Sequence, residues 1–328
     1  MATPIVQRTY SADEIMTSSP PIWSPVKQLV FDLSSPLGTR HRGELQFRRW
    51  YVEDFPELMP SGPDLIITGK ENVYDYVPLG DDESALAWHV NFADPELFVA
   101  YGSPLMAQDE IQAAEHPVLG ALREKLLTDP SESITLTVEA GEPTPITIAN
   151  IERRCIVMTD ADQEKARPNG LYGNRFAKAS PEIIRNAVIP LNPSTQSNLI
   201  AMAAPYGGFG EYDRAEVKYI LQTAYTGFDA VRSETMRLKS SNAQVHIHTG
   251  FWGCGAFGGN RLLMLLLQIY AAKLAQVNSL VIHTVDQTGS DWLKEAQNRI
   301  SGHLENTPGQ FIQWIVSLNL RWGESDGN

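Results

Sequence analysis

The sequence predicts an α/β sandwich whose sheet is largely parallel. Strand-like and helix-like segments alternate in the C-terminal third: AQVHIH (243–248) is followed by a helical pattern over 261–277, and SLVIHTVD (279–286) by another over 291–304. Such alternation is typical of parallel sheets covered by helices. The 261–277 segment is apolar on nearly every side, so that helix is expected to be buried.

The other elements follow from hydrophobic spacing and turn residues. ALAWHVNFA (85–93) reads as a buried strand, and 109–127 has helical spacing that is interrupted at Pro117. A further helix is expected over 214–226, and FIQWIVSLNLRW (311–322) closes the chain before a polar tail. Residues 1–25 are expected to form an extended surface arm and 161–200 long loops. Further strand candidates are 27–33, 64–69, 134–140, 144–150 and 154–160.

Composition and charge exclude several classes of protein. The 328 residues are 43% hydrophobic and 20% charged, which is ordinary for a globular protein. A net charge of -13 argues against direct nucleic-acid binding, because phosphate backbones are bound through Lys and Arg. The chain has no apolar run of membrane-spanning length and its first residues do not resemble a secretory signal. Only two cysteines occur, Cys155 and Cys254, so we expect free thiols and a cytoplasmic location.

A glycine-rich segment directly precedes the apolar helix. HTGFWGCGAFGGN (248–260) holds five glycines. Glycine lets the backbone approach a ligand closely, and the N–H groups at a helix start favour an anion such as phosphate. Asn260 is placed to cap the helix. The segment therefore predicts a phosphate-binding turn, with a turn needed for packing alone as the alternative.

Two other functions fit this segment less well. Gly253, Gly255 and Gly258 fit the G-x-G-x-x-G pattern of nicotinamide dehydrogenases, but no acid stands about 20 positions later at a strand end. His246 and His248 share a strand face near Cys254, yet spacing places no further metal ligand. We therefore predict neither a dehydrogenase nor a metal site, and no cofactor.

Asp109 and Glu110 are adjacent acids at the start of the predicted 109–127 helix, after Gln108. Adjacent helical positions do not face each other, so at most one of the two is expected to point into a site. Acids at a helix start also interact favourably with the helix dipole, which is the alternative explanation for the pair.

Read together, these two segments resemble the poly(ADP-ribose) glycohydrolases, the macrodomain family that removes ADP-ribose. TGFWGCGAFGGN before an apolar helix resembles the family's C-terminal signature; VNFAD (90–94) and QDEI (108–111) resemble its V-D-F-A-N and Q-E-E-I motifs at the same spacing. The resemblance covers roughly residues 80–305. It implies a three-layer α/β/α macrodomain with a mixed, largely parallel sheet over 81–328, and residues 1–80 as an N-terminal extension packed on it.

The resemblance also implies roles for individual residues. Glu110 would be the catalytic acid and base at the ribose glycosidic bond, with Asp109 positioning the substrate. Asp94 would hold the distal ribose, and Phe257 would pack over the sugar. An acid just upstream, Asp81 or Asp82, would accept from the adenine amine. The remaining substrate-binding residues implied are Asn91, Gln108, Thr249, Phe251, Gly253, Cys254, Gly255, Ala256 and Gly258.

The sequence departs from the family at several of these positions. Phe98-Val99-Ala100 replaces the family's triple glycine. Asn91 stands where the family has Asp, and Asp94 stands where it has Asn. Because Gln108-Asp109-Glu110 is retained, we predict a divergent hydrolase with a changed substrate: an ADP-ribosyl or related NAD-derived group on protein, polymer or a small molecule. The alternatives are a non-catalytic ADP-ribose-binding module and a protein that processes an NAD-derived small-molecule intermediate.

Overall fold

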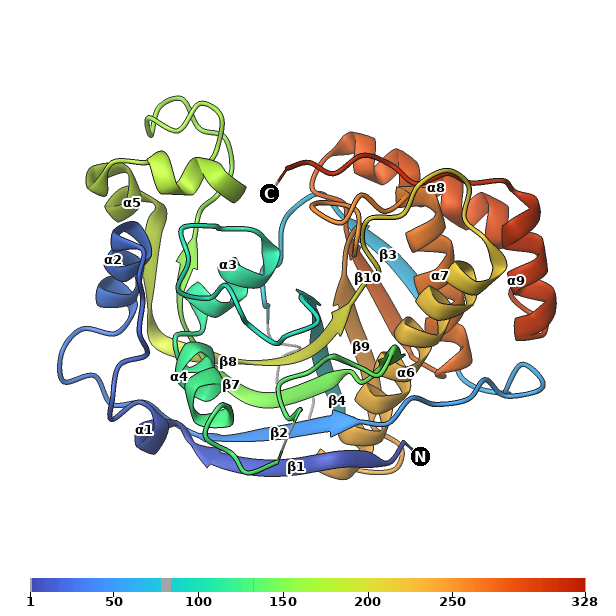
Figure 1. The fold of residues 1–328 in the computed structure, drawn as a ribbon, viewed down its shortest axis with the longest axis horizontal. Helices are drawn as coiled ribbons and strands as arrows, with labels where there is room; N and C mark the ends of the chain where they lie inside the picture. Colours follow the sequence, from blue (N-terminus) through green and yellow to red (C-terminus); the bar gives the residue numbers. More distant parts are fainter. Residues whose placement is uncertain (1, 78–83, 132, 328) are drawn as a thin grey trace.

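The computed structural model describes residues 2–77, 84–131 and 133–327. Its centre is an eight-stranded sheet with the order β1-β2-β7-β8-β4-β9-β10-β3 (Figure 1). The β8, β4, β9, β10 and β3 strands pair in parallel, whereas β1, β2, β7 and β8 pair antiparallel. The sheet is thus mixed and largely parallel, as predicted. The strands are β1 (Pro4–Ser11), β2 (Glu44–Trp50), β3 (Ile66–Lys70), β4 (Ala85–Ala93), β7 (Ile146–Val157), β8 (Val188–Ala203), β9 (Gln244–Thr249) and β10 (Ser279–His283).

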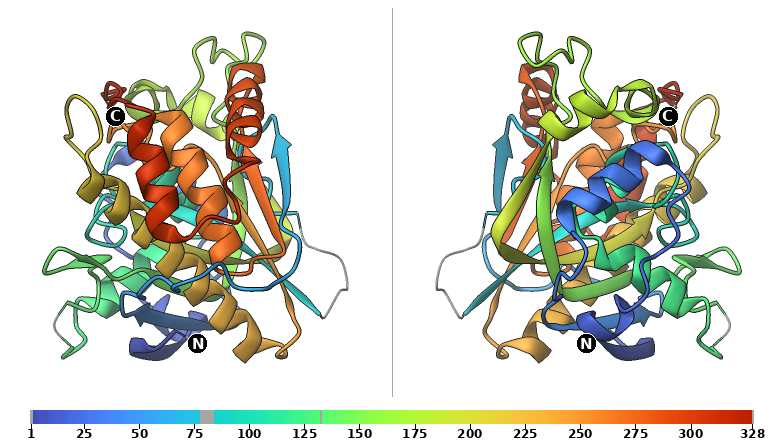
Figure 2. Two further views of the ribbon diagram at one scale, coloured as in Figure 1. Left: turned by 90° about the vertical axis from the view of Figure 1, so that its right-hand side faces the viewer. Right: turned by 90° about the vertical axis from the view of Figure 1, so that its left-hand side faces the viewer.

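Helices cover both faces of the sheet, which makes the predicted three layers. One face packs against α6 (Arg214–Leu238), α7 (Arg261–Leu274), α8 (Gln287–Ile300) and α9 (Pro308–Ser317). The other face packs against α1 (Ala12–Ile15), α3 (Gln108–Glu115) and α4 (Val118–Leu126). Figure 2 shows the C-terminal helices in orange and red in front in one side view, and the N-terminal helices in blue in front in the other.

The alternation of side chains along β4 shows why both faces are buried. Trp88 and Val90 point into the core under α6 and α7, whereas Ala93 belongs to the core on the α3 side. His89 and Asn91, which share the α3 face with Ala93, are also buried. This face of β4 is therefore polar where it meets α3.

The first 80 residues contribute strands to the same sheet. β1 and β2 lie at one edge and β3 at the other. The prediction of an extended arm over 1–25 was wrong, since residues 4–11 pair with β2. The 27–33 segment, predicted as a strand, lies in the helix α2 (Pro25–Ser34). Ser24 caps this helix and Pro25 begins it, two helix-start signals that outweigh its short apolar run.

Two further predictions were wrong because β7 and β8 are longer than the sequence pattern indicates. The 144–150 and 154–160 candidates form one strand, β7, and the predicted 161–200 loop contains η1 (Gly173–Lys178), α5 (Pro181–Ala187) and most of β8. The outer part of β8 is exposed and polar, so hydrophobic spacing does not detect it. Of the 134–140 candidate only β5 (Val138–Glu139) is a strand, pairing with β6 (Glu142–Pro143).

The helix predicted over 214–226 begins where expected but continues to Leu238 as α6. The other predicted elements are confirmed within a few residues at their ends, including the break between α3 and α4 around Pro117. Within the described ranges, none of the helices has the length and apolar character needed to span a lipid bilayer.

Candidate active site

Gln108 fixes the start of α3 to the end of β4. Its Oε1 accepts from the Phe92 N–H at 2.8 Å, and its Nε2 donates to the Val90 carbonyl at 3.1 Å. Both polar groups of this amide are therefore used inside the protein. Gln108, which was predicted to bind substrate, also fixes the position of the two acids that follow it.

Asp109 faces β4 and is buried. Its Oδ1 accepts from Asn91 Nδ2 at 2.8 Å, and the same Nδ2 also donates to Gln112 Oε1 at 2.8 Å. Burial raises the pKa of Asp109 strongly, and the neighbouring Glu110 charge raises it further, while the Asn91 hydrogen bond opposes the shift. The two sequence-predicted residues Asn91 and Asp109 are thus brought into direct contact.

Glu110 is 4% exposed. One carboxylate oxygen, Oε2, accepts from the Ala107 N–H at 2.9 Å, which makes Glu110 part of the helix cap as well as a candidate acid. Burial raises the pKa of this carboxyl, and the Asp94 charge adds to the rise, whereas Lys27 lowers it. Asp94 therefore lies within electrostatic reach of both acids, and its own Oδ1 accepts from the Glu96 N–H.

Lys27, on α2, is a member of this site that the sequence analysis missed. It is 2% exposed, and its Nζ donates to the Ala100 carbonyl at 3.4 Å. Burial lowers the pKa of Lys27 to about 8, although the charges of Glu110 and Asp109 oppose that shift. A cavity of about 20 Å³ adjoins it, which is room for about one water molecule. No motif or spacing connects Lys27 with residues 109–110, so only the fold reveals the pairing.

The glycine turn is closed by its own backbone. The N–H groups of Cys254, Gly258 and Gly259 donate to the carbonyls of Phe251, Gly255 and Gly253. Gly253 and Gly258 have φ values of 75° and 70°, the left-handed region that favours glycine. Asn260 then caps α7, as predicted, by accepting from the Leu263 N–H at 3.1 Å. Residues 255–257 form the apex of the turn.

Several signature side chains support the turn from inside the protein. Trp252 is fully buried and donates to the Met202 carbonyl, and Thr249 donates to Gln268 on α7. Cys254 contacts the Trp252 carbonyl through its sulfur, and burial raises the pKa of its thiol to about 12. Phe251 packs under the Arg261 guanidinium. These contacts hold the backbone of the turn in place.

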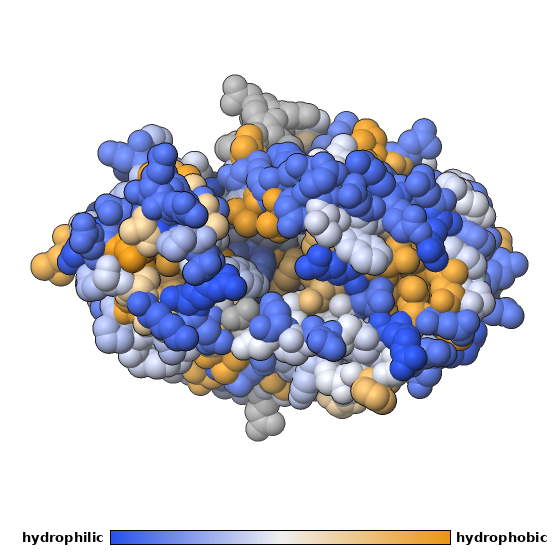
Figure 3. All heavy atoms as spheres, turned by 90° about the horizontal axis from the view of Figure 1, so that it is seen from above, coloured by the Kyte–Doolittle hydropathy of each residue, from blue (hydrophilic) through white to orange (hydrophobic). Residues whose placement is uncertain are grey.

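A pocket of about 450 Å³ opens beside the apex of the turn. Phe257 lies on its wall with Tyr206, and the two ring centroids are 5.6 Å apart. Tyr206 is largely exposed. Seen from above, this side of the molecule is hollowed between the α5 side and the α8 side (Figure 3). The remaining wall residues are Gly207, Gly208, Ala256, Gly258, Gly323 and Ser325.

The C-terminal tail, defined here as residues 323–327, lies across the glycine turn. The Gly323 N–H donates to the Gly258 carbonyl at 2.9 Å, and the Asp326 N–H to the Gly255 carbonyl at 3.4 Å. A Cβ on Gly255 would lie 3.2 Å from Asp326 Oδ2. A carboxylate thus stands against the turn that is predicted to bind a phosphate.

Charges from both halves of the site act on Tyr172. Burial raises the pKa of its hydroxyl to about 12, and the negative charges of Asp326 and Glu110 both add to this rise. Asp326 lies against Gly255, so Tyr172 is within electrostatic reach of the turn's covering residue and of the candidate acid at once. Because β4 and β9 are parallel neighbours, residues 108–110 after β4 and residues 253–258 after β9 both lie at the carboxyl-end edge of the sheet.

Phe98-Val99-Ala100, the segment in place of the family's triple glycine, has one residue with a backbone conformation that favours glycine. Phe98 has φ 52°, a conformation that costs a non-glycine residue about 1–2 kcal/mol. Its side chain is fully buried in the core beneath α4. Phe98 therefore does not crowd the site with its ring, whereas Val99 is exposed. Asp81 and Asp82, the predicted adenine contacts, lie outside the described residues.

Comparison with protein families supports the half of the site that contains the glycine turn. Residues 152–291 match the family model described as "Poly (ADP-ribose) glycohydrolase (PARG), Macro domain fold". No curated protein matches the chain. Among solved structures, the glycohydrolase from Thermomonospora curvata bound to the inhibitor ADP-HPD is 13% identical, with 89% of this chain and 84% of that chain covered and a TM-score of 0.43. That from Deinococcus radiodurans in complex with ADP-ribose is 10% identical, with 90% and 95% covered and a TM-score of 0.39.

The matched segment includes the glycine turn and α7, while Gln108, Asp109 and Glu110 lie upstream of it. The resemblance predicted from the sequence is confirmed in this segment: residues 152–291 carry the sequence pattern of the poly(ADP-ribose) glycohydrolase family.

Proposed function

We propose that this protein is a divergent macrodomain hydrolase that cleaves a glycosidic bond to ADP-ribose or a related NAD-derived group. The observation that carries the proposal is the pair of buried acids, Asp109 and Glu110, both with raised pKa, at the same edge of the sheet as a glycine turn that matches the family. Buried carboxyl groups with raised pKa are suited to proton transfer near neutral pH.

Glu110 acts as the general acid and then as the general base. Its proton passes to the leaving oxygen or nitrogen as the bond to the ribose anomeric carbon breaks. The resulting carboxylate takes a proton from water, whose oxygen forms the new bond to that carbon. Glu110 ends protonated as it began, so no cofactor is consumed. Asp109, held by Asn91, positions the substrate.

The glycine turn and its pocket hold the rest of the substrate. Backbone N–H groups at the apex, residues 255–257, are suited to a diphosphate, with the start of α7 behind them. Tyr206 and Phe257 offer aromatic faces for a sugar or a base. The glycine turn lies in the segment that matches the poly(ADP-ribose) glycohydrolase family model, which supports an ADP-ribosyl ligand here. The two free cysteines, Cys155 and Cys254, fit a reducing compartment such as the cytoplasm.

A second candidate is a binding module without catalysis. It is favoured by the low exposure of Glu110, whose Oε2 already serves as a helix cap. Such a protein would bind ADP-ribose at the glycine turn and leave the bond intact.

One experiment separates these functions. Release of ADP-ribose is measured from ADP-ribosylated protein, from poly(ADP-ribose) and from NAD, with the wild type and the Glu110→Gln variant. Calorimetry with ADP-ribose, NAD and AMP measures binding by both. We expect release that falls by about 10²- to 10⁴-fold in the variant while ADP-ribose binding is kept. Exposed Glu182→Gln on α5 is the matched control.

Equal rates near zero with intact binding would establish the binding module instead. If none of the three ligands binds, both candidate functions are wrong.

A further inference from the structure

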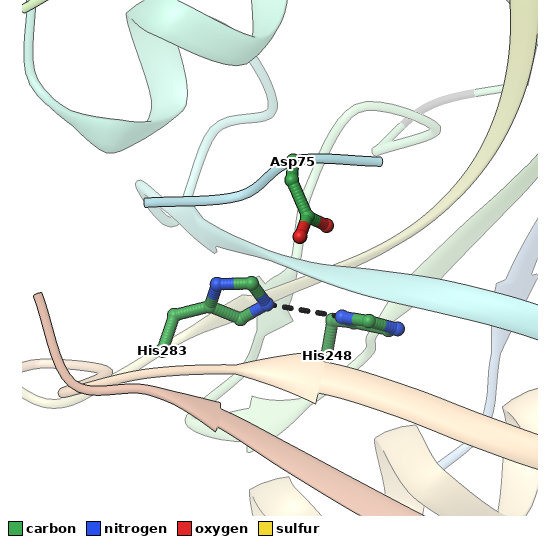
Figure 4. Close-up of side chains that lie close together, drawn as sticks. All are labelled: Asp75, His248 and His283. Carbon is green, nitrogen blue, oxygen red and sulfur yellow. Dashed lines mark hydrogen bonds between the residues drawn. The ribbon is translucent and has the colours of Figure 1, made fainter. Parts of the chain in front are cut away.

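We infer that His248, His283 and Asp75 form a site for a divalent transition-metal ion, with Zn²⁺ as the expected occupant. The three side chains come from β9, from the last residue of β10 and from the segment after β3. Their potential ligand atoms all lie within 4.8 Å of one another. In Figure 4 the Asp75 carboxylate points toward the two imidazole rings.

The topology explains why three distant residues meet. β9, β10 and β3 are neighbours in the parallel part of the sheet, so their carboxyl ends lie at one edge. His248 pairs in register with Val281, and His283 follows two residues later on the same face. Asp75 is five residues beyond the end of β3. Spacing along the sequence places no third ligand beside His248, because the fold, not the spacing, supplies Asp75 and His283.

The distances suit a small metal ion. His248 Nδ1 and His283 Nε2 are 3.0 Å apart. Two nitrogens bound to one tetrahedral Zn²⁺ at 2.0–2.1 Å are separated by roughly 3.3 Å. The ring positions therefore need to move by only a few tenths of an ångström, and the Asp75 side chain by on the order of 1 Å, to complete three ligand bonds.

The hydrogen bonds of His283 prepare it as a ligand. Its Nδ1 faces two oxygens, Asn72 Oδ1 at 3.0 Å and the Val73 carbonyl at 3.1 Å. A carbonyl oxygen only accepts, so Nδ1 carries the proton and the lone pair is on Nε2, toward His248. A histidine that donates its other N–H to a carbonyl is the usual partner arrangement of a metal-bound imidazole.

Both histidines are buried. Metal binding takes place through the neutral imidazole, and burial favours that form. Two imidazole nitrogens and one carboxylate favour zinc and its neighbours over Mg²⁺ and Ca²⁺, which prefer oxygen ligands. Three protein ligands leave a fourth position open for water or a further group.

The Lys70 ammonium group would compete with a metal ion for the Asp75 carboxylate. Its Nζ lies 2.9 Å from Asp75 Oδ2, and Asn72 Nδ2 lies 3.3 Å from the same oxygen. The ammonium and a metal ion compete for one carboxylate, so removing the Lys70 charge should strengthen metal binding. This competition gives the proposal a test in which a substitution increases affinity.

The bound ion would cross-link three parts of the chain just before the glycine turn. Thr249 follows His248 directly and leads into that turn. In the absence of metal, the same two nitrogens share a hydrogen bond, His248 Nδ1–H donating to His283 Nε2. The ion and the hydrogen bond are alternatives, so the site can form in a protein that also folds without metal.

The test uses untagged full-length protein freed of metal by a chelator. Zn²⁺ is titrated against a chromophoric competitor, and Co²⁺ is added separately to record its visible absorption. We expect one Zn²⁺ per chain and a tetrahedral Co²⁺ spectrum. Affinity should fall at least tenfold in Asp75→Asn and His283→Gln and rise severalfold in Lys70→Gln. His246→Gln, on the same strand face but outside the group, is the matched control and should bind as the wild type does.

Thermal unfolding with and without Zn²⁺ provides a second measurement. Zn²⁺ should raise the Tm of the wild type and of His246→Gln, and not that of Asp75→Asn. Asp75 is partly exposed on a connecting segment, so its variant carries the test even if His283→Gln fails to fold. Zn²⁺ affinity that is the same in wild type, Asp75→Asn and Lys70→Gln would overturn the proposal, as would equal affinity for Mg²⁺.

Discussion

Asn91 on β4 donates through Nδ2 to Oδ1 of Asp109 on α3, at 2.8 Å, and both side chains are buried. The contact ties the first turn of the helix to the sheet. It also gives the two adjacent acids different surroundings, because Glu110 takes its hydrogen bond from the Ala107 backbone instead. Two carboxyl groups in different environments are what an acid and a positioning group require.

Asp109→Asn should raise stability at neutral pH while lowering activity. Burial raises the pKa of Asp109 in the folded protein above its unfolded value, so its contribution to stability is fully present below the unfolded pKa and is lost as pH rises through the folded pKa. An amide of the same shape avoids that loss and still accepts from Asn91. The gain should be about 1 kcal/mol or more at pH 8 and vanish near pH 4.

The measurement is Tm against pH for wild type and variant, together with the rate of ADP-ribose release. A variant that is less stable than the wild type at pH 8 would show that Asp109 is charged and well compensated in the folded protein, contrary to this prediction.

Removing the Lys27 charge should move the pH dependence of catalysis. Lys27 opposes the raised pKa of both acids, so Lys27→Met should raise the pKa of Glu110 further. The limb of the kcat/KM profile on which the general acid loses its proton is expected to move up by roughly 0.5–1 pH unit. Lys125→Met, exposed on α4, serves as the control. If the pH profile of Lys27→Met is the same as that of the wild type, the Lys27 charge does not affect the pKa of the catalytic acid.

Much of the fold could be predicted because its pattern is local. The apolar α7 and the strands that flank it combine hydrophobic spacing with turn residues, and they are found where expected. The errors come from segments where tertiary pairing outweighs local pattern. β1 is half exposed at a sheet edge, and the outer part of β8 is polar because it faces solvent. Neither has the alternation that identifies a strand.

Only those residues of the candidate site that belong to a recognisable sequence motif could be predicted. Glu110 and Gly253–Gly258 belong to short recognisable segments, so their positions were available from the sequence. Lys27, Asp326 and Asp75 come from parts of the chain that have no motif. Their contacts depend on how α2, the C-terminal tail and the segment after β3 fold against the sheet.

Substitutions at two glycines of the turn should act differently. A Cβ on Gly253 would lie 2.6 Å from the Ala204 Cβ, and its φ of 75° disfavours any side chain, so Gly253→Ala should lower stability by about 1–3 kcal/mol. Gly255 lacks a positive φ, and its nearest neighbour is the flexible Asp326 side chain. Gly255→Val should therefore keep the Tm and weaken ADP-ribose binding at least tenfold. Thermal unfolding and calorimetry on both variants measure the two effects, and a Gly255→Val protein that binds normally would remove the apex from the ligand site.

Ending the chain at Trp322 should strengthen ADP-ribose binding. The deletion removes the tail that lies on Gly255 and Gly258, together with the Asp326 carboxylate. It leaves Trp322, which stacks on Tyr212 at 4.4 Å and donates to Glu216, so the core under the turn is kept. An anion near a helix start is worth up to about 1 kcal/mol, and a bound carboxylate competes with a diphosphate for that position.

The expected gain in affinity on deletion is therefore about two- to fivefold by calorimetry. Asp326→Asn should give part of it, because it removes the charge and leaves the backbone contacts of the tail. Sodium chloride should reduce the difference between wild type and Asp326→Asn, since the repulsion is electrostatic. If the deletion instead weakens binding, the tail is a wall of the ligand site, and its hydrogen bonds to the glycine turn then hold the pocket in shape rather than cover it.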